Sequence, residues 1–130
     1  DQTLAFGQHL LSVPANTLCD LKTVTTGTGS CKKATKAVSV VISTWIDATG
    51  KLNIAFDKPL RFAPNSSGQL PALYLYDPAA AESTTSAIKS CTVEGGCTDT
   101  TTDAQRTLKD KTSGYVYRSI DSFLGYNLWA

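Results

Sequence analysis

The stretch that decides the fold is Val38-Ser-Val-Val-Ile-Ser-Thr-Trp-Ile46, followed by Asp47-Ala-Thr-Gly50 and Lys51-Leu-Asn-Ile-Ala-Phe56. Aliphatic and polar residues alternate in the first segment, with Val38, Val40, Ile42 and Ile46 on one face and Ser39, Ser43 and Asp47 on the other. Period-two alternation is typical of a half-buried strand, and a link that contains Asp and Gly is typical of a turn. The sequence therefore predicts a β-hairpin, and we expect the centre of the core at four of its residues, Val40, Ile42, Ile54 and Phe56.

Short strand-like segments lie on both sides of this hairpin. They are Thr3–Phe6, Leu10–Val13, Ala72–Tyr76, Gly114–Ile120 and Phe123–Trp129, and Pro59 and Pro64 bracket a further short segment, Leu60–Phe62. One helical turn is expected after Asp77, which can cap it, with Pro78 at the first helical position. Because no amphipathic helix lies between the strands to serve as a crossover, the chain is predicted to be an all-β antiparallel sandwich of about seven to nine short strands.

Length and composition limit the architecture and the class of partner. A chain of 130 residues can bury one core but is too short to divide, so residues 1–130 are predicted to form a single domain. No apolar run approaches the roughly 18 residues of a membrane helix, so we expect no transmembrane segment. The 12 Lys and Arg against 11 Asp and Glu leave a formal net charge of +1, which argues against a nucleic-acid partner.

Four cysteines, Cys19, Cys31, Cys91 and Cys97, fall into two pairs that are each close in the sequence. Four cysteines allow three connectivities, which sequence alone leaves open, but local pairing is favoured because the two glycines before Cys97 suit a chain reversal. Neither the Cys-x2-4-Cys spacing of a zinc site nor the Cys-x-x-Cys of a redox site is present. We predict the disulfides Cys19–Cys31 and Cys91–Cys97, and therefore a periplasmic or extracellular protein. A start at Asp1 without Met also fits an exported chain after removal of its signal peptide.

No group of residues in the sequence has the spacing of an active site. His9 is the only histidine, and no Gly-x-Ser-x-Gly elbow presents a nucleophile to it, so we interpret it as a polar turn residue. Asp47 and Asp57 flank the hairpin and are interpreted as turn residues rather than as a glycosidase pair. Asp99 and Asp103 lack the regular spacing of a calcium loop. We therefore predict a non-enzymatic protein with no catalytic residue, no cofactor and no metal site.

Aromatic residues of the later strands alternate with aliphatic ones. The aliphatic residues, which we expect to face the core, are Leu73, Leu75, Val116 and Ile120. The aromatic residues, which we take as candidates for an interface, are Tyr74, Tyr76, Tyr115, Tyr117 and Trp129. Tyr and Trp are favoured anchors in protein interfaces. The alternative is that these rings pack across strands or cap the edges of the core.

The order of several strand and turn segments resembles one group of proteins. The segments are Ser12–Ala15, the Cys19–Cys31 loop, Val38–Asp47, Gly50 with Ile54–Asp57, Leu60–Pro64, Leu73–Tyr76, Gly114–Arg118 and Phe123–Asn127. They are similar to uncharacterised exported β-sandwich domains of environmental bacteria, which are distantly similar to ZU5 domains. The resemblance covers most of the chain and implies a sandwich fold and export, without implying any catalytic position. The chain also resembles in kind the small periplasmic accessory subunits of bacterial photosynthetic reaction-centre and light-harvesting complexes.

Together these features favour a non-catalytic exported interaction domain. We expect it to dock on protein subunits of a larger envelope or membrane-associated assembly, of which a photosynthetic reaction-centre complex is one example. A small-ligand or glycan-binding module that uses the same aromatic residues is the alternative, and a secreted hydrolase is the third hypothesis. The fold class alone does not separate them, because β-sandwiches serve all three functions.

Overall fold

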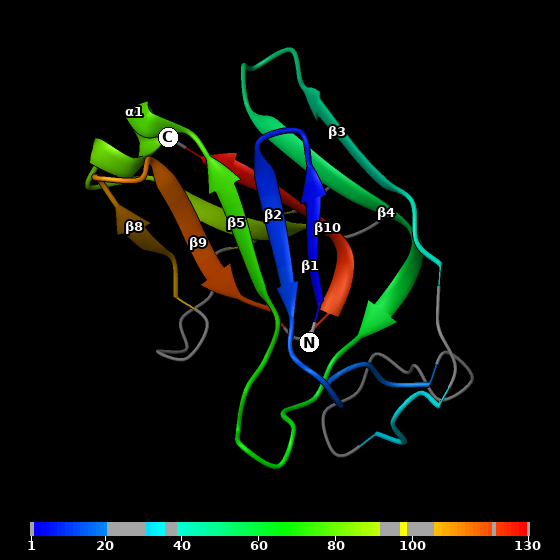
Figure 1. The fold of residues 1–130 in the computed structure, drawn as a ribbon. Helices are drawn as coiled ribbons and strands as arrows, with labels where there is room; N and C mark the ends of the chain where they lie inside the picture. Colours follow the sequence, from blue (N-terminus) through cyan, green and yellow to red (C-terminus); the bar gives the residue numbers. More distant parts are fainter. Residues whose placement is uncertain are drawn as a thin grey trace.

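The computed structural model describes residues 2–20, 31–35, 39–91, 97–98, 106–120 and 122–129. Within these ranges the chain forms ten strands and one short helix. The strands make two antiparallel five-stranded sheets that pack face to face (Figure 1). The predicted all-β sandwich is therefore confirmed, with one strand more than the upper end of the expected range.

The first sheet has the strand order β1-β2-β5-β9-β8. Its strands are β1 (Gln2–Phe6), β2 (His9–Val13), β5 (Ala72–Tyr76), β9 (Tyr115–Ser119) and β8 (Leu108–Asp110). A tight turn joins β1 to β2, and Gly7 in this turn has a φ of 63°, a left-handed conformation that glycine adopts without strain. All of these strands except β8 match segments that the sequence alternation predicts.

The second sheet has the strand order β3-β4-β10-β6-β7. Its strands are β3 (Ile42–Ile46), β4 (Leu52–Arg61), β10 (Ser122–Trp129), β6 (Ala87–Cys91) and β7 (Cys97–Thr98). The sequence did not predict β6, although it lies between β10 and β7. Ile88 is its only large aliphatic residue, so the pattern of β6 is weak and its pairing partners hold it in the sheet.

The deciding hairpin forms, but its first strand is shorter than expected. β3 pairs with β4 from Ile42 opposite Phe56 to Ile46 opposite Leu52. Just before Ile42, the backbone N–H of Val41 donates to the Asp57 side chain, at 2.8 Å, instead of to a backbone carbonyl. The ladder therefore ends at Ile42, and Val38 lies outside the described residues.

The segment around Leu60 is not a separate strand, because β4 continues through it to Arg61. Pro59 has no N–H to contribute to a ladder, and the pairing of β4 with β10 changes register between Phe123 and Gly125. A Cβ atom at Gly125 would lie 3.1 Å from the carbonyl oxygen of Ile54. The close approach of the two strands at this irregularity therefore favours glycine.

The expected helical turn is confirmed as α1 (Pro78–Glu82). Asp77 is its N-cap and accepts a hydrogen bond from the Ala80 N–H at 3.1 Å. Ala80 and Ala81 are buried, so the short helix adds to the core that the sheets form.

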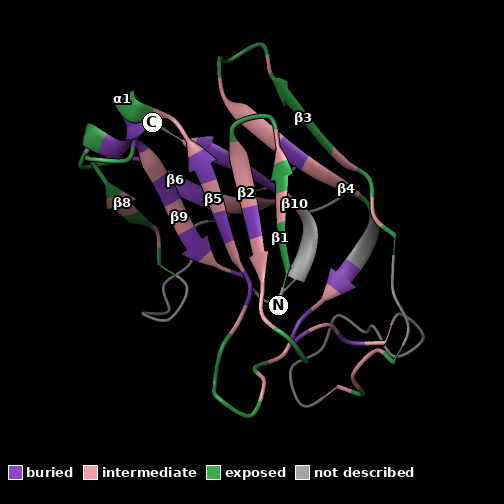
Figure 2. Ribbon diagram, viewed as in Figure 1, coloured by how far each residue is buried: buried purple, intermediate pink, exposed green. Residues whose placement is uncertain are grey.

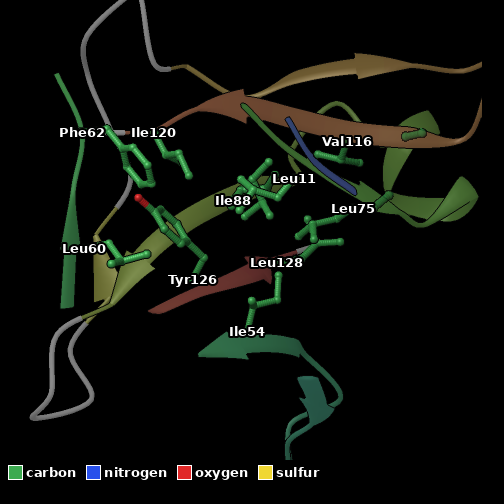
Figure 3. Packing of buried hydrophobic residues seen from close by; sticks show 13 residues of the cluster. Leu11, Ile54, Leu60, Phe62, Leu75, Ile88, Val116, Ile120, Tyr126 and Leu128 are labelled. Atoms are coloured by element: carbon green, nitrogen blue, oxygen red, sulfur yellow. The ribbon is translucent and has the colours of Figure 1, made fainter. Parts of the chain in front are cut away.

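The core lies between the inner faces of the two sheets, and Figure 2 shows the buried residues on the facing strands. Side chains from both sides meet in it (Figure 3), among them Leu11, Leu75, Val116, Ile54, Ile88, Tyr126 and Leu128. The expected centre was wrong in part, because Ile54 is buried but Val40, Ile42 and Phe56 only pack against the cluster. β3 is an edge strand, so its side chains are covered from fewer directions, and Ile46 is 63% exposed.

Both predicted disulfides are present, Cys19–Cys31 and Cys91–Cys97. Cys91 and Cys97 lie opposite each other in the pairing of β6 with β7, as expected for two ends of a reversal. Cys19 is fully buried, and its N–H donates to the carbonyl of Arg61 at 2.9 Å. The first disulfide therefore lies against the end of β4. Residues 21–30 and 92–96 of the two loops are outside the described part of the chain.

Candidate functional site

The four tyrosines of β5 and β9 lie together on the outer face of the first sheet. Their aliphatic neighbours Leu73, Leu75, Val116 and Ile120 are 0% exposed, as the alternation predicts. The tyrosines point to the opposite side and are half-buried. Tyr74 lies opposite Tyr117 in the strand pairing, and Tyr76 lies opposite Tyr115.

The tyrosine rings contact one another across the strands. Tyr74 and Tyr117 stack with ring centroids 5.0 Å apart and planes at 19°. Tyr115 meets Tyr74 edge-on at 6.2 Å and Tyr76 at 5.5 Å. The Tyr115 hydroxyl donates to the carbonyl of Gln8 at 3.0 Å. The tyrosine rings therefore pack across the strands and also remain partly open to solvent.

An apolar row runs across this face from one edge of the first sheet to the other. In order of pairing it consists of Ala5, Leu10, Tyr74, Tyr117 and Leu108. We call these five residues, together with Tyr76 and Tyr115, the tyrosine face. Leu108 is 38% exposed at the outer end of the row. Leu10 and Leu108 were not among the residues predicted for this face. Leu10 could have been found, because adjacent residues of a strand point to opposite faces, so the pair Leu10-Leu11 must place one aliphatic side chain on the outer face.

The outer face of the first sheet is almost free of charge. Its outward strand positions are Thr3, Ala5, Leu10, Ser12, Ala72, Tyr74, Tyr76, Leu108, Asp110, Tyr115, Tyr117 and Ser119. Asp110 is the one charged residue among these positions, and its carboxylate accepts hydrogen bonds from the N–H groups of Thr112 and Ser113. An antiparallel sheet that faces water on one side normally carries polar side chains there. A neutral, aromatic outer face is instead typical of a surface that meets a partner.

His9 is the first residue of β2 and contacts the backbone of this face at Tyr76. Its Nδ1 accepts a hydrogen bond from the Tyr76 N–H at 2.9 Å, and its ring lies 5.6 Å from that of Phe6. Burial lowers the pKa of His9, while the nearby Asp77 carboxylate acts in the opposite direction. Nδ1 therefore acts as a structural acceptor at the first residue of β2, where the sequence predicted a turn residue.

Trp129 does not belong to the tyrosine face. It lies on β10 in the second sheet and faces outward, since its neighbour Leu128 faces the core. Lys51 and Lys89 place their ammonium groups over its ring, with Nζ atoms 4.1 and 3.7 Å from the centroid. The five aromatic candidates of the sequence are thus divided between opposite outer faces of the sandwich.

Asp47 organises a turn of the hairpin, as the sequence predicts, whereas the predicted turn at Asp57 was wrong because Asp57 lies within β4. Asp47 Oδ1 accepts hydrogen bonds from the Thr49 N–H, the Thr49 hydroxyl and the Lys51 N–H, and Oδ2 accepts from Asn53. These bonds, the Thr49 hydroxyl first, lower the pKa of Asp47 well below its ordinary value. Among the described residues no group of three His, Cys, Asp or Glu could hold a metal ion, and Asp99 and Asp103 lie outside those residues.

The described part of the chain has no helix long and apolar enough to cross a membrane. Comparison of the chain with protein-family models, with curated proteins and with solved structures finds no match.

Proposed function

We propose that this chain is a non-catalytic binding domain that docks on a protein partner through the tyrosine face. The observation that carries the proposal is the apolar row that crosses all five strands of the first sheet on its outer side. Its centre is a cluster of aromatic rings with hydroxyl tips, and its ends are small or aliphatic residues. Such an aromatic centre with few charges is the composition of the buried middle of a protein interface.

The packing of the rings favours a protein partner over a sugar. A sugar stacks on an open aromatic face, but Tyr74 and Tyr117 stack on each other, so one face of each ring is already occupied. Tyr supplies a large contact area at small cost in side-chain entropy, which suits a flat protein interface.

The two disulfides support the proposed location. Two disulfides are typical of an oxidising compartment, so we infer that the domain works in the periplasm or outside the cell. The partner that we propose there is a protein subunit of a larger envelope or membrane-associated assembly. A photosynthetic reaction-centre complex, to whose accessory subunits the sequence bears a likeness in kind, is one assembly of this class.

The proposal is tested by retrieving the chain with its partner from its natural source, using two matched substitutions. Leu108→Glu puts a charge on the tyrosine face, and Ile46→Glu puts the same charge on β3, away from it; both positions are exposed, at 38% and 63%. We expect Leu108→Glu to abolish retention of the chain in the assembly, because an unpaired charge is costly at an apolar interface. Ile46→Glu should be retained like the wild type.

A third variant measures the aromatic contribution. Tyr117→Ala should weaken binding by about 2 kcal/mol or more if Tyr117 is an anchor. Melting temperatures of all three variants show whether the fold survives. Equal retention of Leu108→Glu, Tyr117→Ala and the wild type would place the interface elsewhere on the molecule.

A further inference from the structure

The outer face of the second sheet differs in chemistry from the tyrosine face. A cross-strand row runs over it from β3 to β6 through Trp45, Asn53, Asn127 and Lys89. Trp45 is 49% exposed at one end of the row. Neighbouring strands are about 4.8 Å apart, so the three steps from Trp45 to Lys89 span roughly 14 Å. Asn127 is only 5% exposed, so the groups that this row presents to solvent are the Trp45 ring, the Asn53 amide and the Lys89 ammonium group.

Two ammonium groups gather at the lysine end of the row. Lys51 and Lys89 both lie over the Trp129 ring, with Nζ atoms 4.1 and 3.7 Å from its centroid. The indole N–H of Trp129 donates to Asn127 Oδ1 at 2.6 Å, which fixes the ring that both lysines contact. A cation–π contact attracts the ammonium group without neutralising its charge.

The charges of these lysines are only partly balanced within the described chain. Lys51 Nζ donates to the Thr49 hydroxyl at 3.0 Å, and this hydroxyl donates to Asp47 at 2.6 Å. Asp47 is therefore near Lys51, but its oxygens already accept four hydrogen bonds in the turn. Among the described residues no carboxylate forms an ion pair with Lys89. Ammonium donors remain for an external anion at this end.

Asn53 provides a fixed acceptor in the middle of the row. Its amide donates to Asp47 Oδ2 at 2.9 Å and to the Lys51 carbonyl at 3.0 Å. Both donors are thus used within the hairpin, and the side-chain carbonyl oxygen remains to accept a hydrogen bond from a hydroxyl group. An amide that is held in this way costs little entropy when a ligand binds.

We propose that this face binds an acidic oligosaccharide. A carboxylate or sulfate group of the sugar contacts the ammonium groups of Lys51 and Lys89, a hydroxyl group donates to Asn53, and an apolar sugar face covers the exposed ring of Trp45. The site lies on the opposite side of the sandwich from the tyrosine face. Its failure and the failure of the proposed docking function are therefore separate outcomes, measured with different substitutions.

The test uses Trp129 as its own reporter. The chain has two tryptophans, so Trp45→Phe leaves Trp129 as the only indole while keeping an aromatic ring at position 45. The purified, disulfide-bonded variant is titrated with a uronate oligosaccharide, a sulfated oligosaccharide and a neutral oligosaccharide of the same length. We expect a saturable change in Trp129 fluorescence with the acidic sugars, weakened by salt, and no change with the neutral sugar.

Substitutions then assign the contacts. Lys51→Gln and Lys89→Gln should each weaken binding of the acidic sugar at least tenfold, and Lys111→Gln, on an exposed turn of the first sheet, should leave it unchanged. Trp45→Ala removes the aromatic ring and should weaken binding as well, which calorimetry measures. Melting temperatures check that every variant is folded.

Three results would overturn the proposal. They are the absence of a saturable change with either acidic sugar, equal binding of the neutral sugar, and unchanged binding by both lysine variants. Anionic phospholipid vesicles serve as a further probe against neutral phosphatidylcholine vesicles. A response to the anionic vesicles without any response to the acidic sugars would assign the two lysines to a membrane surface and would also contradict the saccharide site.

Discussion

Arg118 shows how a single residue joins the two sheets. It is 3% exposed and extends from β9 in the first sheet, where Nε donates to the Ser119 carbonyl at 3.1 Å. Across the core, Nη1 donates to the carbonyl of Ile88 on β6 at 3.1 Å, and the guanidinium lies 5.2 Å from the ring of Tyr126 on β10. The buried guanidinium group is therefore held by one carbonyl oxygen of its own strand, and by a carbonyl oxygen and an aromatic ring of the opposite sheet.

Replacing Arg118 by Met should therefore destabilise the fold. The variant keeps a long apolar stem but leaves the Ile88 carbonyl without its donor, which costs about 1–3 kcal/mol. Urea unfolding of Arg118→Met measures this cost, and Arg106→Met, at an exposed position, is the control that should change little. An Arg118→Met protein as stable as the wild type would mean that the burial of the charge offsets all that its contacts contribute.

Asp47 makes the stability of the hairpin depend on pH. Its folded pKa lies below the ordinary value of 3.8, because the Thr49 hydroxyl, the Asn53 amide and the Lys51 N–H bind the ionised form. Because the pKa of Asp47 is lower in the folded than in the unfolded chain, its ionised carboxylate stabilises the fold fully at a pH well above the unfolded-state pKa. This stabilisation is lost as the pH falls through the folded-state pKa.

The expected result is a melting-temperature difference between the wild type and Asp47→Asn that depends on pH. Asp47→Asn should melt below the wild type at pH 7, and the gap should narrow as pH falls below the ordinary pKa of 3.8. Thermal melts at intervals from neutral to strongly acidic pH measure it. A gap that stays constant over this range would show that the carboxylate charge does not stabilise the turn.

At the scale of elements, β3 is an edge strand with little protection. Its sequence is Ile-Ser-Thr-Trp-Ile, without charge or proline, and Trp45 and Ile46 are 49% and 63% exposed. Natural edge strands usually carry charges, prolines or bulges that prevent pairing with another chain. β3 is therefore the strand at which we expect two copies to associate at high concentration.

Ile46→Lys should reduce this association without lowering stability. The lysine interrupts the apolar edge, and the exposed position gives it access to water. Light scattering over a concentration series, with a melting curve, measures both effects. Ile42→Lys is the contrasting variant, because Ile42 packs against the core and the charge there should destabilise the fold. Unchanged scattering of Ile46→Lys would contradict a role of β3 in self-association.

The elements that could be predicted are those whose own residues carry the period of two. The alternation of Leu73 and Leu75 with Tyr74 and Tyr76 gives both the strand β5 and the direction of each face. β6 and β8 could not be predicted in this way, because neither carries a clear alternation of large apolar residues. The local pattern also does not predict that the Asp57 side chain accepts the hydrogen bond of the Val41 N–H, next to the end of the β3 ladder at Ile42.

At the scale of the whole molecule, what the sequence could not provide is the order of strands. β5 lies between β2 and β9, and β10 lies between β4 and β6, so half of the neighbouring strand pairs in the two sheets are distant in the chain. The apolar row of the tyrosine face exists only through this order. For the same reason, the sequence grouped Trp129 with the tyrosines, whereas its strand belongs to the other sheet.

Footprinting of tyrosine side chains in the native assembly tests whether a partner covers the tyrosine face. The reactivity of each ring is compared between the isolated chain and the assembly purified under mild conditions. The account predicts that Tyr74, Tyr115 and Tyr117 react less in the assembly, while buried Tyr126 stays unreactive in both states. Equal reactivity of those three rings in both states would contradict the account.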